Sequence, residues 1–190
     1  MSDATERPKR TGEGRLPGDL EPEAIVERMV RVDHAGEYGA RRIYEGQLAV
    51  LGGSQSGPTI RKMYEQELEH LETFERLIAE RRVRPTALQP LWHIAGFALG
   101  ASTALLGEKA AMACTVAVEE VIDEHYAKQA AQLGEDEADL RETIERFRAD
   151  ELEHRDTGLE HGAEEAPGYE PLSAAIKAGS RLAIWLSERI

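Results

Sequence analysis

The tetrapeptide Glu-Leu-Glu-His occurs twice in the chain, at residues 67–70 and 151–154. Helical residues three positions apart lie on the same face, so each copy would present one carboxylate and one imidazole together. Both groups are common metal ligands, and Glu-x-x-His is part of the ligand set of helical bundles that bind two metal ions. The repeated tetrapeptide therefore predicts a metal site to which two helices contribute.

A second pattern precedes each copy. Glu37 is followed seven residues later by Tyr44, and Glu119 is followed seven residues later by Tyr126. These two pairs are offset by 82 residues, and the two tetrapeptides are offset by 84 residues. We interpret the chain as an internal duplication of a helix pair, with halves at about 21–82 and 109–161.

All four glutamates fall on apolar helical stripes. Such a position turns a carboxylate toward a bundle core, where an unpaired charge costs many kcal/mol. No Lys or Arg lies beside these residues on the stripes, so two divalent cations are the expected partners. The predicted ligands are Glu37, Glu67, His70, Glu119, Glu151 and His154.

The choice of metal follows from the available ligands. Cys114 is the only cysteine, which excludes an intramolecular disulfide, a cysteine zinc site and a cysteine-ligated iron–sulfur cluster. We expect this residue to be a small buried one, since its neighbours are apolar. Carboxylates with two imidazoles favour iron or manganese.

Neighbouring polar residues are candidates for supporting roles. Asp150 and Gln66 each precede a ligand glutamate and could orient a ligand histidine. Tyr44 and Tyr126 lie about 10 Å along the axis from the glutamate of their own helix, too far to share its metal ion; hydrogen bonding near the site and simple packing remain open for both.

Two further histidines lie close to the predicted ligands in the sequence. His34 precedes Glu37 by three residues, and His125 is next to Tyr126. Each could support the site by hydrogen bonding or could be an ordinary surface residue.

Composition limits the class of protein. With 190 residues, 41% of them hydrophobic, the chain can form one domain with its own core. A formal charge of −13 argues against nucleic-acid binding, which needs clustered Lys and Arg. Residues 1–20 are almost devoid of apolar side chains and read as a flexible tail, with neither a secretory signal nor a mitochondrial presequence.

Helical periodicity, interrupted by glycine and proline, indicates an all-α domain over 21–190. We expect a ferritin-like four-helix bundle with a crossover segment and an additional C-terminal helix. The expected helices are 21–51, 58–82, 107–133, 135–161 and 172–190, with a turn at 167–171 before the last.

The crossover contains the only long apolar run, at 91–107. Its 17 residues are fewer than the ~20 needed to cross a bilayer. One interpretation is a buried core helix; the other is a segment that enters a membrane interface or lines a lipid-sized cavity. Gly96 and Gly100 have the spacing of a helix-packing motif, which is weak evidence in so short a run.

Several stretches closely resemble the demethoxyubiquinone hydroxylase family of ubiquinone biosynthesis, also called the Coq7 or Clk-1 family. They are RVDHAGEYGARRIYEGQLAVL at 31–51, VRPTALQPLW at 83–92, GFALGASTALLGEKAAMACTVAVEE at 96–120, DELEHRD at 150–156 and LSERI at 186–190. The resemblance runs from about residue 25 to the C-terminus and implies a di-iron monooxygenase that hydroxylates the ring of a polyprenylated demethoxyquinol.

The resemblance also implies details of the chemistry. It assigns the same six ligands, with Glu67 and Glu151 bridging two iron ions, and it implies O2 as co-substrate and NADH as a reductant. No glycine motif for dinucleotide binding occurs in the chain. A polyprenyl tail resides in a bilayer, so we expect peripheral attachment through 91–107, at the cytoplasmic side of a bacterial cell membrane, with partner proteins of the biosynthetic pathway.

Two other classes of protein fit some of these features. A ferritin-type ferroxidase or iron-storage protein shares the bundle and the ligands, but it has no need of the apolar run. A metal-free helical interaction protein would use the acidic residues only as a solvated surface.

Overall fold

The computed structural model describes residue 18 and residues 20–190; most of the predicted tail at 1–20 lies outside the described residues. The described part contains six α-helices and two short 3-10 helices, and it has no strand, which confirms the all-α prediction. The elements are α1 Pro22–Leu51, α2 Gly57–Arg81, α3 Gln89–Leu105, α4 Glu108–Ala130, η1 Glu135–Glu137, α5 Ala138–Glu160, η2 Ala163–Glu165 and α6 Tyr169–Ser187.

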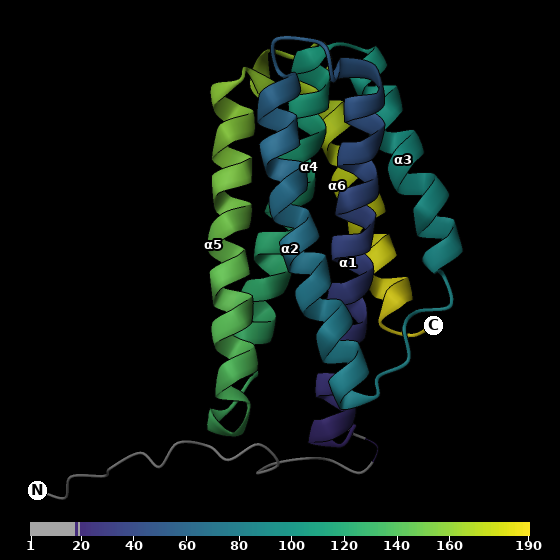
Figure 1. Ribbon diagram of the computed structural model, residues 1–190, viewed down its shortest axis with the longest axis vertical. Coiled ribbons are helices and arrows are strands. Elements are labelled where there is room, and N and C mark those ends of the chain that lie inside the picture. The colour runs from purple at the N-terminus through teal and green to yellow at the C-terminus, as the bar shows by residue number, and fades with distance from the viewer. Residues whose placement is uncertain (1–17, 19) are drawn as a thin grey trace, which may run out of the picture.

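Helices α1, α2, α4 and α5 form a bundle, and α3 runs along the outer side of α1 (Figure 1). Helix α6 packs against α4 on the side away from α5 (Figure 1). Helix α4 is therefore enclosed by neighbours, and its many alanines, such as Ala111, Ala113 and Ala117, are fully buried. Small side chains at these positions let the surrounding helices approach closely.

The apolar core of the described part of the chain consists of three clusters, of which two occupy the bundle and the third joins α4 to α6. In the bundle, one cluster contains Ile60, Met63 and Met112, and the other contains Phe74, Ile144 and Phe147. The predicted ligands continue the same helical stripes, so the core is interrupted by acidic and imidazole side chains along its length.

Helix α3, which contains most of the apolar run, is not the buried core helix that one of our two interpretations expected. It is a peripheral helix, and its buried residues are limited to Gly96, Gly100, Thr103 and Ala104. A Cβ atom on Gly100 would lie 1.9 Å from the carbonyl oxygen of Ile43, and a Cβ on Gly46 would lie 2.2 Å from that of Phe97. These glycines thus allow the backbones of α1 and α3 to come into contact. The spacing of Gly96 and Gly100 had been only weak evidence for such helix packing, because the apolar run is short.

The last helix begins earlier than expected. Helix α6 begins at Tyr169, inside the predicted turn at 167–171, and Gly168 before it has a left-handed backbone with φ of 71°. Pro171 fits within the first helical turn because its missing amide proton would have no partner there. Within the described residues, no helix combines the length and the apolarity needed to cross a bilayer.

Candidate metal centre

The six predicted ligands come from the four bundle helices and meet inside the bundle. Helix α1 contributes Glu37, α4 contributes Glu119, and α2 and α5 each contribute one Glu-x-x-His pair. Each of the six is at most 3% exposed. The apolar stripes on which they lie drive this burial, because each stripe must face the core.

The six side chains form two overlapping groups. Glu37, Glu67, His70 and Glu151 make one group, and Glu67, Glu119, Glu151 and His154 make the other. Within each group, one ligand atom per residue lies within 4.8 Å of all the others. Glu67 and Glu151 belong to both groups, so they are the residues placed to contact two ions at once.

Each histidine directs Nδ1 toward the carboxylates. His70 Nδ1 lies 3.2 Å from Glu151 Oε1 and 3.5 Å from Glu37 Oε2. His154 Nδ1 lies 3.2 Å from Glu67 Oε1 and 3.2 Å from Glu151 Oε2. The same nitrogen of each ring is therefore available for a metal ion.

The other ring nitrogen of each histidine is held by a side chain of the facing helix. His70 Nε2 pairs with Asp150 Oδ2 at 3.1 Å, and His154 Nε2 pairs with Gln66 Oε1 at 3.2 Å. These partners fix the orientation of the imidazole rings, which is the usual role of groups behind a metal-binding histidine. Asp150 and Gln66 thus lie where the sequence had suggested.

Both tyrosines contact the glutamate of the other half. The Tyr44 hydroxyl donates to Glu119 Oε1 at 2.9 Å, and the Tyr126 hydroxyl donates to Glu37 Oε1. Each tyrosine is too far along its own helix to reach the glutamate of that helix. Because α1 and α4 run antiparallel, each tyrosine instead contacts the glutamate of the facing helix.

The donor atoms of the site fit two cations. Four buried atoms that face the centre lack a hydrogen-bond partner of acceptable geometry: Glu67 Oε1, Glu151 Oε2, His70 Nδ1 and His154 Nδ1. Buried polar atoms normally have partners, so this set calls for a ligand between them. Two divalent cations would balance four carboxylates, and two neutral imidazoles complete a donor set suited to iron or manganese.

Without metal, protons must balance the same charges. Burial, together with the negative charge of Glu151, raises the pKa of Glu67 and of Glu119 well above the usual value. Burial would also raise the pKa of Glu151, but His154 and His70 beside it lower this pKa to about 2. Burial would lower the pKa of His70, yet nearby Glu151 and Glu37 raise it to about 12.

A second buried polar cluster was missed at the sequence level. Gln129 Nε2 donates to Asp33 Oδ1 at 2.8 Å, and His125 Nε2 lies 3.2 Å from the same oxygen. Gln129 stands 82 residues after Gln47, which is also buried, so the duplication offset could have identified it. His125 is therefore paired with Asp33 and supports the α1–α4 contact.

His34 is buried in α1, and its Nδ1 has no hydrogen-bond partner among the described residues. It is not part of either ligand group. Burial lowers the pKa of His34, which favours the neutral ring. The structure thus excludes the surface interpretation of this residue.

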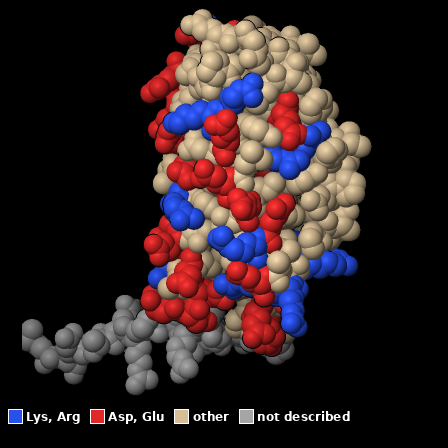
Figure 2. Space-filling view, viewed as in Figure 1, with Lys and Arg blue, Asp and Glu red and all other residues tan. Residues whose placement is uncertain are grey.

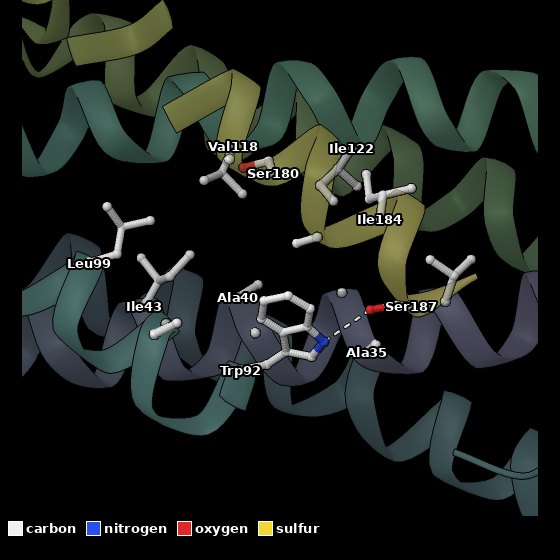
Figure 3. A pocket seen from close by; sticks show the side chains of 17 residues that line it. Ala35, Ala40, Ile43, Trp92, Leu99, Val118, Ile122, Ser180, Ile184 and Ser187 are labelled. Atoms are coloured by element: carbon white, nitrogen blue, oxygen red, sulfur yellow. Dashed lines mark hydrogen bonds between the residues drawn. The ribbon is translucent and has the colours of Figure 1, made fainter. Parts of the chain in front are cut away.

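An apolar pocket of about 370 Å³ lies between α1, α3, α4 and α6. Its lining includes Gly36 of α1 and Val118 of α4, each next in sequence to a glutamate of the site. Trp92 of α3 donates its indole N–H to Ser187 Oγ of α6 at 3.0 Å, and this bond joins the two helices beside the pocket (Figure 3). The pocket therefore approaches the site from the side of Glu37 and Glu119.

Comparison with known proteins identifies the family. Residues 24–187 match the family described as ubiquinone biosynthesis protein COQ7. The chain belongs to this family. A relative is the 3-demethoxyubiquinol 3-hydroxylase of Rhodospirillum rubrum, which is 61% identical over 183 residues, covering 96% of this chain and 86% of the relative.

More distant members of the COQ7 family have names that describe related activities. The human NADPH-dependent 3-demethoxyubiquinone 3-hydroxylase, mitochondrial, is 57% identical over 171 residues, or 88% of this chain and 79% of the human protein. The mitochondrial 5-demethoxyubiquinone hydroxylase of Saccharomyces cerevisiae is 41% identical over 203 residues, or 98% of this chain and 87% of the yeast protein. The resemblance inferred from the motifs is thus confirmed.

Proposed function

We propose that the chain hydroxylates the ring of a polyprenylated demethoxyubiquinol, using two iron ions held by the six residues of the site. The hydroxylase names of relatives 57–61% identical assign it a hydroxylation step of ubiquinone biosynthesis. The observation that carries the metal proposal is that two ligand groups share Glu67 and Glu151. When bound, iron supplies the redox chemistry that activates O2.

The protein side of the mechanism is to fix and shield this centre. Asp150 and Gln66 hold the histidine rings with Nδ1 directed inward. Glu119 and Glu37 each belong to a single ligand group. Tyr44 donates a hydrogen bond to Oε1 of Glu119 and Tyr126 to Oε1 of Glu37, which leaves Oε2 of each carboxylate for metal. The surrounding apolar clusters exclude water, which would otherwise compete with the substrate for the reactive centre.

The apolar pocket is our proposed site for the quinone ring. Its volume of about 370 Å³ falls within the range of small-molecule sites. Its lining contains Gly36 and Gly39 of α1, where absent side chains bring the ligand close to the backbone that carries Glu37. A ring in the pocket would face the centre between α1 and α4.

Exposed apolar side chains surround this pocket and support membrane attachment. Ile94 of α3 is 69% exposed, and Leu182 and Trp185 of α6 are 56% and 51% exposed. Helix α3 carries no charged residue, and its side of the molecule is almost free of red and blue atoms (Figure 2). We infer that this face rests on a bilayer, from which the substrate tail reaches the pocket.

The reductant is proposed to be a reduced nicotinamide nucleotide. The name of the human relative specifies NADPH, whereas the sequence-based expectation for this chain is NADH. A direct comparison of the two nucleotides in the hydroxylation assay tests that expectation.

The decisive assay is conversion of demethoxyubiquinone by the purified protein with iron, O2 and reductant. We expect product from the wild type and none from Glu151→Ala, because this residue belongs to both ligand groups. Absence of product from the wild type, or equal product from the variant, would refute the proposal.

Pocket filling tests the quinone site separately. A Cβ atom on Gly179 would meet no atom within 4 Å, and Gly179 lies in the pocket lining. Gly179→Leu should therefore reduce turnover without changing metal content. Ala178→Leu, on the exposed surface of the same helix, is the matched control and should retain turnover.

Membrane attachment is tested by flotation with vesicles. The double variant Ile94→Glu with Trp185→Glu should lose vesicle binding, since charges replace the exposed apolar side chains. Leu68→Glu adds a charge to a half-exposed leucine of α2 and should leave binding intact. Equal flotation of all three proteins would refute attachment through α3 and α6.

The ferritin-type alternative gains no support from the relatives, whose names describe hydroxylases. Gel filtration and iron mineralisation distinguish it, because an iron-storage protein forms a large cage that accumulates many ions per chain. The metal-free alternative would require only trace iron or manganese in protein prepared both with and without air.

A further inference from the structure

A cleft that contains charged and polar side chains lies between α2 and α5, on the opposite side of the centre from the apolar pocket. It has a volume of about 320 Å³. At its outer end, Lys62 Nζ pairs with Glu153 Oε1 at 2.9 Å, and both side chains are more than half exposed. At its inner end lie His154 and Gln66, joined by the hydrogen bond at 3.2 Å.

The equivalent place in the other half is filled. With the 84-residue offset, the counterpart of Met63 in the cleft wall is Phe147. The Phe147 ring stacks on the His70 ring with centroids 3.9 Å apart. The Arg146 guanidinium carbon lies 5.0 Å from the centroid of the Phe147 ring. An aromatic ring therefore stacks on His70, whereas at the counterpart position Met63 and His154 both line the cleft.

The lining of the cleft suits a hydrated cation. Thr59, Thr157 and Gln66 offer oxygen atoms along it, and Glu153 adds a negative charge near the mouth. The apolar pocket offers almost none of these groups, and moving an ion through an apolar site carries a large desolvation cost. The net charge of −13 further favours the approach of cations from solution.

We propose that this α2–α5 cleft is the aqueous entrance through which divalent metal ions reach the centre, so that metal and quinone enter from opposite sides. The inference rests on the metal centre proposed above. His154 separates the cleft from the carboxylates, with Nε2 toward Gln66 and Nδ1 toward Glu67. Rotation of this ring away from Gln66 opens the last step of the path.

The Lys62–Glu153 ion pair forms the outer gate. Exposed pairs of this kind contribute little stability, so the pair opens readily. Its lysine still places a positive charge at the mouth, which repels an incoming cation.

The experiment measures the rate at which metal-depleted, folded protein takes up Co²⁺, followed by visible absorbance after rapid mixing. Thr157→Phe fills the cleft, and Thr73→Phe makes the same change at the counterpart position 84 residues earlier. We expect Thr157→Phe to slow uptake several-fold and Thr73→Phe to leave it unchanged. Both variants should bind the same final amount of Co²⁺ as the wild type.

A second pair of variants serves if either phenylalanine variant fails to fold. Lys62→Ala should accelerate Co²⁺ uptake, and the acceleration should shrink at high salt because screening weakens the removed repulsion. Arg146→Ala, at the counterpart position, should have no effect on the rate.

Two outcomes are distinguishable. Equal uptake rates within both matched pairs, with full Co²⁺ binding at equilibrium, would overturn the entrance and leave the metal centre standing. Failure of the wild type to bind Co²⁺ at equilibrium would overturn the metal centre and the entrance with it.

Discussion

Metal binding to this protein should release protons, and the number follows from the site. Without metal, burial raises the pKa of Glu67 and of Glu119 well above its usual value and so favours their protonated forms, and His70, with a pKa of about 12, carries a positive charge. Burial alone would lower the pKa of His154, but the carboxylates of Glu151 and Glu119 raise it. A divalent ion replaces these protons, because metal ligands must be deprotonated.

The magnitude can be worked out for pH 6.5. His70, with a pKa of about 12, releases one proton, and His154 releases more than half of one because its pKa is raised above 6.5. Glu67 and Glu119 add to this number, because burial raises the pKa of each carboxyl well above its usual value. The expected total therefore lies between about 1.5 and about four protons for two divalent ions. A site made of solvated surface carboxylates would release almost none, because such groups are already ionised at this pH.

The assay adds Co²⁺ or Mn²⁺ to metal-depleted protein in a weak buffer with an indicator dye. Calorimetry in two buffers of different ionisation enthalpy gives an independent count. Glu151→Ala serves as the control, since it removes the carboxylate shared by both ligand groups. Release of fewer than about 1.5 protons at saturation would refute the protonation states derived for the site.

The same shifts predict how the stability of the metal-free protein depends on pH. A group with a raised pKa in the folded state stabilises the fold below its unfolded pKa, and this contribution is lost as the pH rises through the folded value. For Glu67 and Glu119 the loss begins above about 4.5, and for His70 it extends from 6.5 toward about 12. The melting temperature of metal-free protein should therefore fall between pH 6 and pH 9, and saturating metal should remove most of this dependence.

Three further predictions concern single residues. Tyr126→Phe removes a donor from Glu37 and should weaken metal binding by about 10- to 100-fold in chelator competition, whereas Tyr64→Phe, away from the site, should not. Gly100→Ala should lower the melting temperature, because its Cβ would lie 1.9 Å from a backbone atom of α1. Gly179→Ala, where a Cβ has free space, should leave the melting temperature unchanged. Equal melting temperatures of the two variants would contradict the close packing of α3. Cys114 is fully buried, and burial raises its pKa to about 12, so a disulfide reagent at pH 8 should modify it only after denaturation.

The sequence by itself determined the bundle and the ligand types. A helix has a fixed period, so a Glu-x-x-His pair on an apolar stripe must face the core wherever the helix packs. The 82- and 84-residue offsets then showed that the two halves contribute alike. Local spacing of this kind depends only on backbone geometry, which explains why all six predicted ligands meet in the structure.

Contacts between helices were decided only by tertiary structure. Antiparallel pairing gives Tyr126 a partner 89 residues away in Glu37, and it places Asp33 beside Gln129; no spacing along one helix encodes either. Helix α3 is apolar enough for a core, yet its glycines place it against the outside of α1, where it forms one wall of the apolar pocket. Whether an apolar stripe is buried or left exposed depends on which helices remain to cover it, and that is a property of the assembled fold.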